Sequence, residues 1–150
     1  MSSIKQQLYD QCIAYVRNRM AEAEQAFKEA EKAQNEDTKS SAGDKYETGR
    51  AMMQQEKDRN TTQLNEANKL MVALNHISIK GNSNVIETGS LVITDNGRFY
   101  IAISAGTLVV DGESYFAVSP ASPIGLKLKG LKAGDGFDLN GKGYKIGVVM

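Results

Sequence analysis

The spacing of apolar residues changes once along this chain, near residue 80, and this change limits the folds open to it. Up to Asn75 there is no proline, only Gly43 and Gly49 of the 14 glycines occur, and helix formers such as Ala, Glu, Gln and Lys dominate. From Gly81 onward come the other glycines, both prolines and short apolar runs that are typical of strands between turns. We therefore predict an α+β protein.

In the first half, apolar side chains recur at alternating spacings of four and three residues. The residues with this spacing are Val16, Met20, Ala23, Phe27 and Ala30, and then Leu64, Ala67, Met71 and Leu74. Such a repeat predicts two helices packed along a seam, and the polar segment 35–43 predicts the turn between them. We expect residues 1–78 to form a long antiparallel coiled-coil hairpin. Toward the turn its seam passes through Lys57, Asn60 and alanines, so packing contributes less there than at the base.

In the second half, residues 79–150, about five strand candidates surround one short helix candidate. Apolar runs at 91–93, 99–103 and 107–110 predict strands, and 144–150 predicts the last one. The helix signal is Ser122 as the N-cap, proline at the first helical position and glycine at the end. These features predict a small antiparallel sheet with one helix packed on it.

Asp44 and Glu47 follow the predicted turn and lie three residues apart, so both carboxylates share one face of a helix. Two interpretations fit this spacing. An Asp N-cap followed by Glu three residues later is a capping box, which satisfies backbone amides without any further function. The same two oxygen donors can also share a Mg²⁺ ion, which proteins commonly hold with one or two carboxylates plus water and phosphate.

Charge and side-chain chemistry exclude several classes of function. The 18 basic and 18 acidic residues give a formal net charge of zero, so a general affinity for nucleic acid is not expected. Cys12 is the only cysteine and His76 the only histidine, and neither has the neighbours of a catalytic or metal site. The N-terminal residues resemble neither a signal peptide nor a membrane span. We expect a cytoplasmic protein without a membrane partner.

Residues 119–125 read Ser-Pro-Ala-Ser-Pro-Ile-Gly, and Gly43-Asp44-Lys45-Tyr46-Glu47 stands at the predicted turn. These two motifs resemble those of bacterial Gre factors, the transcript-cleavage factors of transcription elongation. The C-terminal pattern of that family runs Ser-x-x-Ser-Pro-Leu-Gly, then a helix ending in Gly, then Lys-x-Gly-Asp. It corresponds here to residues 119–125, Gly130 and residues 132–135, and residues 85–92 are similar to the first strand of the family's domain. The family's tip motif begins Gly-Asp-Leu-Ser-Glu, and this chain has Gly43-Asp44-Lys45-Tyr46-Glu47 at its predicted turn.

The resemblance implies an FKBP-like C-terminal domain and a protein that is not itself an enzyme. It implies binding to bacterial RNA polymerase, with the coiled coil in the secondary channel, where it stimulates the polymerase to cleave backtracked transcripts. Asp44 and Glu47 would be the catalytic and metal residues and help hold a Mg²⁺ shared with the polymerase active site, which the free protein does not bind tightly. The implied polymerase-binding residues are Ser122, Pro123, Ile124 and Gly125. Nascent RNA and DNA would be met only within the elongation complex.

Two alternatives stay open. After Glu47 the family continues Asn-Ala-Glu-Tyr, whereas this chain has Thr48-Gly49-Arg50-Ala51. A Gre-like regulator that occupies the secondary channel without promoting cleavage fits this departure. A coiled-coil protein-interaction adaptor is the second alternative, and in it Asp44 and Glu47 are only a helix cap.

Overall fold

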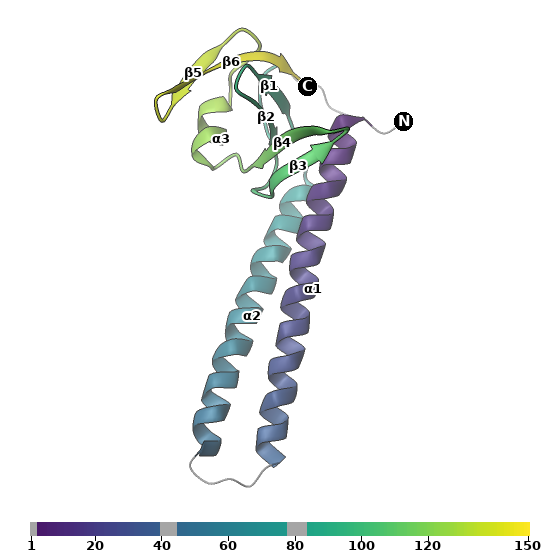
Figure 1. Cartoon of the computed structure of the whole chain (residues 1–150), viewed down its shortest axis with the longest axis vertical. Coiled ribbons are helices and arrows are strands. Elements are labelled where there is room, and N and C mark those ends of the chain that lie inside the picture. The colour runs from purple at the N-terminus through teal and green to yellow at the C-terminus, as the bar shows by residue number, and fades with distance from the viewer. Residues whose placement is uncertain (1–2, 40–44, 78–83) are drawn as a thin grey trace. The chain divides into compact units, whose positions relative to one another are not determined.

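The computed structural model describes the backbone of residues 3–39, 45–77 and 84–150, and the side chains of these residues outside 34–50 (Figure 1). Two long helices precede six strands and a short third helix, which confirms the α+β class. The elements are α1 (Ile4–Lys39), α2 (Lys45–Asn75), β1 (Leu91–Thr94), β2 (Gly97–Ile101), β3 (Gly106–Val110), β4 (Glu113–Val118), α3 (Pro123–Leu128), β5 (Gly136–Leu139) and β6 (Lys142–Val149).

The chain divides into two compact units. A helical unit spans Val16–Met71, and a sheet unit contains the chain before residue 16 together with the chain after residue 71. The ends of α1 and α2 therefore belong with the strands, although the sequence places them in the helical half. The predicted boundary between residues 78 and 79 lies outside the described residues.

The sheet has the strand order β3-β4-β2-β1-β6-β5 and is mixed. The prediction of a purely antiparallel sheet is wrong at one pair, because β2 and β4 are parallel, with Phe99 opposite Phe116. The physical reason is the path of the chain. After β2 it runs to the edge as β3 and returns as β4 between β3 and β2, so β4, antiparallel to β3, takes the direction of β2.

Two hairpins have turns in which both central residues have positive φ. Asp111 and Gly112 have φ 53° and 78°, and Asn140 and Gly141 have φ 52° and 79°. These values are typical of the two-residue type I′ turn, for which Asp-Gly and Asn-Gly are favoured. The turns fix the registers of β3 with β4 and of β5 with β6. Of the segment 85–92, which the resemblance implies as the first strand, only Leu91 and Val92 belong to β1. Glu87 to Ser90 form a turn, and Val85 makes an isolated bridge to Lys132.

One face of the sheet carries α3 and a compact apolar core. Leu128 of α3 is fully buried, and Ile124 packs against the same core from a partly buried position. The buried residues of this core are Ile86, Val92, Phe99, Ile101, Leu128 and Ile146. A helix packed on the sheet was predicted, and this part of the prediction is confirmed.

The helix ends of the sheet unit contribute further buried residues. Leu8, Cys12 and Leu74 have no exposed surface, and Tyr100 of β2 is 1% exposed. The Gln11 side-chain amide donates to the backbone carbonyl of Val109 at 2.8 Å, which ties α1 to the edge strand β3 (Figure 1). Burial raises the pKa of Tyr100, and nearby Cys12 adds to the rise. The helix ends are therefore part of the β domain's own packing.

In the helical unit, α1 and α2 lie side by side (Figure 1). Val16, Ala23, Ala30 and Ala67 are buried along this seam. Among the described residues, no helix carries an apolar stretch of the length that a bilayer crossing needs.

Candidate functional site

The predicted polymerase-binding residues form a hydrogen-bonded turn that starts α3. The hydroxyl of Ser122 accepts a hydrogen bond from the Gly125 amide at 3.1 Å, and Pro123 occupies the first turn, which confirms the predicted cap. The amide and hydroxyl of Ser122 both donate to the carbonyl of Ser119, at 3.0 and 2.5 Å. The Ser119 hydroxyl in turn accepts from the Ala121 amide at 3.1 Å. Both serines are therefore needed to build the turn.

Gly125 completes this turn because it leaves room for the chain that precedes it. A Cβ atom at Gly125 would collide with the carbonyl oxygen of Ser119 and lie 3.0 Å from backbone atoms of Pro120. The backbone atoms of Ser119 and Pro120 cannot move away from a new Cβ atom as the end of a flexible side chain could. The pattern Ser-x-x-Ser-Pro-x-Gly is thus explained by the geometry of the turn itself.

Within α3, the outward side chain is Leu126 and not Ile124. Ile124 is partly buried against the core, whereas Leu126 is 65% exposed. Lys127 and Lys129 beside it are also exposed. Sequence analysis singled out Ile124 and missed Leu126. The signal that distinguishes them is helical spacing, because Ile124 and Leu128 are four residues apart on one face and Leu126 lies between them on the other.

The predicted metal residues are at the turn between the long helices. Asp44 lies outside the described residues. Glu47 is in the first turn of α2, which begins at Lys45, but its side chain is not described. Among the residues whose side chains the structure describes, no cluster of His, Cys, Asp and Glu could hold a metal ion. The metal and capping interpretations of Asp44 and Glu47 both remain as predicted.

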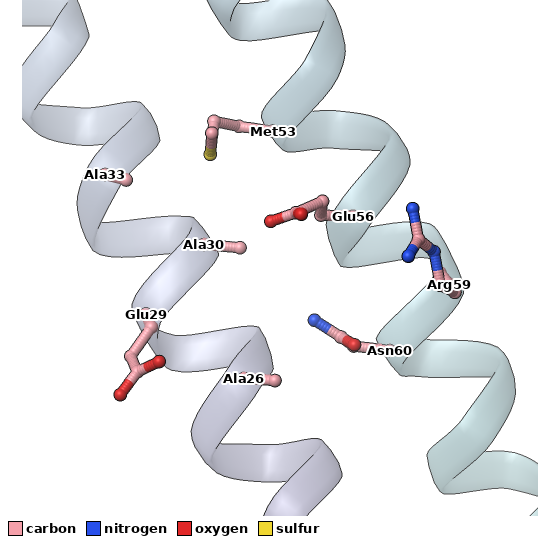
Figure 2. A pocket seen from close by; sticks show the side chains of 8 residues that line it. All are labelled: Ala26, Glu29, Ala30, Ala33, Met53, Glu56, Arg59 and Asn60. Carbon is pink, nitrogen blue, oxygen red and sulfur yellow. The ribbon is translucent and has the colours of Figure 1, made fainter.

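Between α1 and α2 there is a hollow of about 280 Å³ (Figure 2). Three of the four residues on its α1 wall are alanines, and three of the four on its α2 wall are polar. The Glu56 carboxylate and the Asn60 amide point toward α1, while Glu29 and Arg59 point away (Figure 2). The residues that line this inter-helix hollow are Ala26, Glu29, Ala30, Ala33, Met53, Glu56, Arg59 and Asn60.

No family model, no curated protein and no solved structure matches this chain. The chemistry that it offers must therefore be derived from its own residues.

Cys12 does not supply a nucleophile. Its side chain is fully buried, and burial raises its pKa to about 12. Since the thiolate is the reactive form of cysteine, the folded protein holds almost none of it near neutral pH. His76 is exposed just beyond the end of α2. The candidate functional residues are therefore the predicted tip residues Asp44 and Glu47 and those on the exposed side of α3.

Proposed function

We propose that this chain is a Gre-type factor that binds bacterial RNA polymerase and stimulates cleavage of backtracked transcripts. The observation that carries the proposal is the pair of long helices on either side of the acidic motif. At ~1.5 Å per residue, α1 and α2 are each about 50 Å long. In this proposal they form an antiparallel coiled-coil hairpin that enters the secondary channel, and the sheet unit is an FKBP-like domain that stays at the channel mouth.

Asp44 and Glu47 are the functional residues at the tip. Their two carboxylates, three residues apart, suit Mg²⁺, which takes oxygen ligands and keeps several waters. They would hold the ion shared with the polymerase active site and help position the attacking water. The ion, when bound, stabilises the charge that develops on the attacking and leaving oxygens. The polymerase itself cleaves the RNA, so the factor is not an enzyme.

The exposed side of α3 supplies the docking surface on the polymerase. Ser122, Pro123 and Gly125 fix the direction of the short helix through the turn described above. This places Leu126 and the lysines beside it in contact with the partner. An apolar side chain surrounded by cations suits a partner surface with an apolar recess and acidic rim. In the cell, the factor works in the cytoplasm and meets RNA and DNA only within the elongation complex.

The experiment that tests the proposal removes the two tip charges without changing side-chain shape. Asp44→Asn/Glu47→Gln keeps much of the capping ability, so the free energy of unfolding should change by no more than about 1 kcal/mol. Binding to polymerase should persist, whereas cleavage of transcripts in stalled elongation complexes should fall by at least about tenfold. The matched control is Glu22→Gln/Glu24→Gln, which removes two exposed carboxylates elsewhere on α1.

Three results would contradict the proposal, and two of them favour an alternative. If the tip variant cleaves as fast as the parent, Asp44 and Glu47 act only as caps. If the parent binds polymerase but promotes no cleavage, the chain is a secondary-channel regulator, as the residues after Glu47 suggest. If the parent does not bind polymerase at all, the interaction-adaptor alternative replaces both.

A further inference from the structure

The seam of the helical unit changes in character along its length. In one part the inward side chains are apolar, with Val16 fully buried and Leu64 and Met71 partly buried. In the other part the seam is lined by Ala26 and Ala30 on α1, opposite Asn60 on α2. A hollow of about 330 Å³, lined by Arg19, Gln63, Glu66, Ala67, Lys69 and Leu70, borders the apolar part as well, so the two parts differ in the polarity of their inward side chains and not in the presence of a hollow. Since helix pairs gain most of their stability from apolar packing, the two parts differ in how strongly the helices hold together.

Phe27 and Lys57 mark the transition between these parts. The ammonium group of Lys57 lies 5.5 Å from the centre of the Phe27 ring, a cation–π contact between α1 and α2. On the far side of this contact, Ala30 and Ala33 offer only methyl groups to a hollow of about 280 Å³. A Leu at either position would fill part of this space, so the chain forgoes packing that its helices have room for.

The polar side chains in the hollow do not compensate for the lost packing. Asn60 and Glu56 point toward the side of α1 that carries Ala26 and Ala30 (Figure 2). Neither forms a side-chain hydrogen bond or ion pair with any residue whose side chain is described. Hydration of these groups therefore competes with close approach of the helices, and separation of the helices costs less here than at the apolar seam.

We infer that the inter-helix hollow is a compliant joint, at which α1 and α2 separate locally while the apolar seam stays closed. The joint comprises residues 26–33 of α1 and 53–60 of α2. The role of the joint in transcript cleavage rests on the proposed function, since a hairpin that follows the shape of a channel needs local compliance. The existence of the joint does not depend on the proposed function. The low local stability of regions with few buried apolar contacts is the general basis for this inference.

Hydrogen exchange of the unmodified full chain tests the existence of the joint. Amides within 26–33 and 53–60 should exchange at least about tenfold faster than those within 16–23 and 64–71, after correction for intrinsic rates. This comparison needs no variant, so misfolding cannot obscure it. Equal protection of the two sets of amides would overturn the inference.

The variant Ala30→Leu tests whether the hollow causes the faster hydrogen exchange at the joint. Leucine should fill the hollow and slow exchange in 26–33 and 53–60 by severalfold, with little change in 16–23 and 64–71. Ala21→Leu is the matched control, because Ala21 is exposed on the same helix. If Ala21→Leu slows exchange at the joint as much as Ala30→Leu does, helix propensity and not the hollow is the cause, and the inference fails.

A cleavage assay tests the use of the joint. Ala30→Leu should bind polymerase as the parent does but cleave stalled transcripts severalfold more slowly, and Ala21→Leu should do neither. If Ala30→Leu slows hydrogen exchange but cleaves transcripts as fast as the parent, the joint exists but has no role in cleavage. A parent that does not cleave would overturn the proposed function, and the exchange measurements would still decide on the joint.

Discussion

Gly125 shows at the scale of one residue how a sequence pattern can have a purely structural cause. The carbonyl of Ser119 accepts two hydrogen bonds from Ser122 and lies where a Cβ atom of residue 125 would be. Residue 125 therefore has no room for a side chain, and only glycine fits there. The pattern of residues 119–125 therefore specifies the turn. In the proposed function, contact with the polymerase is made by Leu126, which follows this pattern.

We expect Gly125→Ala to destabilise the sheet unit by about 1–3 kcal/mol, since the added methyl group overpacks a site bounded by backbone. The matched control is Gly147→Ala, where the nearest atom is a carbonyl oxygen 3.5 Å from the new methyl group. That variant should stay within about 0.5 kcal/mol of the parent. Chemical denaturation of the three proteins measures the differences. A Gly125→Ala protein as stable as the Gly147→Ala protein would contradict the steric account.

Because of Cys12, the free energy of unfolding should fall as the pH rises into the alkaline range. The unfolded thiol has a pKa of about 8.5, whereas burial raises the folded pKa to about 12. Between these values the unfolded state has lost the proton that the native state keeps, so the free energy of unfolding falls as pH rises. Full stability from this group is present below pH 8.5. The loss is at most about 2 kcal/mol by pH 10, before Tyr100 begins to contribute.

Denaturation curves at pH 7 to 10 for the parent and for Cys12→Ala measure this dependence. The variant loses packing and should be less stable throughout, but its stability should decline less between pH 8.5 and 10. Parallel pH profiles for the two proteins would show that Cys12 does not titrate with unfolding. A thiol reagent should likewise react with the parent only after denaturant is added.

At the scale of elements, helical spacing places Ile124 and Leu128 on one side of α3 and Leu126 on the other, and the core determines which side faces inward. The inward side is set by Leu128, which is fully buried, and by Ile124 four residues before it. The outward side presents Leu126, Lys127 and the beginning of the turn that follows. A charged residue at position 124 would therefore disturb the core, and loss of binding by such a variant would say little about docking.

Leu126→Glu is the sharper test of the docking surface. Its side chain is 65% exposed, so the stability of the variant should stay within about 0.5 kcal/mol of the parent. If α3 faces the polymerase, affinity should fall by at least about tenfold, the loss expected when an apolar contact is replaced by a charge. Val109→Glu is the control, since Val109 is 55% exposed on β3 of the same unit. Equal affinity of both variants in a polymerase pull-down or fluorescence titration would exclude this side of α3.

At the scale of the whole molecule, the ends of the helices belong to the domain that the strands form. Leu8, Cys12 and Leu74 are fully buried within the sheet unit, and Gln11 bonds to the edge strand β3. Lys5 is also buried, and its burial lowers its pKa, with Glu87 opposing this shift. A strand domain without these helix ends would expose the apolar surface that they bury.

We expect a fragment of residues 79–150 to be poorly folded, and a chain in which a Gly/Ser linker replaces residues 24–63 to keep the sheet unit folded. The second chain retains the helix ends, and the first lacks them. Dispersed amide resonances and a cooperative thermal transition should be seen only for the linker chain. A fragment 79–150 that unfolds as cooperatively as the linker chain would show that the strands form a self-sufficient domain.

The sequence by itself determined the features that depend on neighbouring residues. The seven-residue spacing, the run without proline and the Ser-Pro start of α3 predicted two long helices, their seam and the cap at Ser122. Four apolar runs predicted β1, β2, β3 and β6. β4 and β5 were not singled out, although β4 contains the apolar run Tyr115-Phe116-Ala117-Val118.

The tertiary structure decided what depends on contacts between distant residues. Parallel pairing of β2 with β4 follows from where β3 lies in the sheet, and no local pattern specifies that place. Likewise, the core decides that Ile124 packs inward and Leu126 faces outward, and long-range packing assigns the helix ends to the sheet unit. The acidic pair remains a prediction of sequence alone. The spacing of neighbouring residues determines which segments form helices and strands. Burial against distant residues determines which elements lie next to one another and which side of each faces the core.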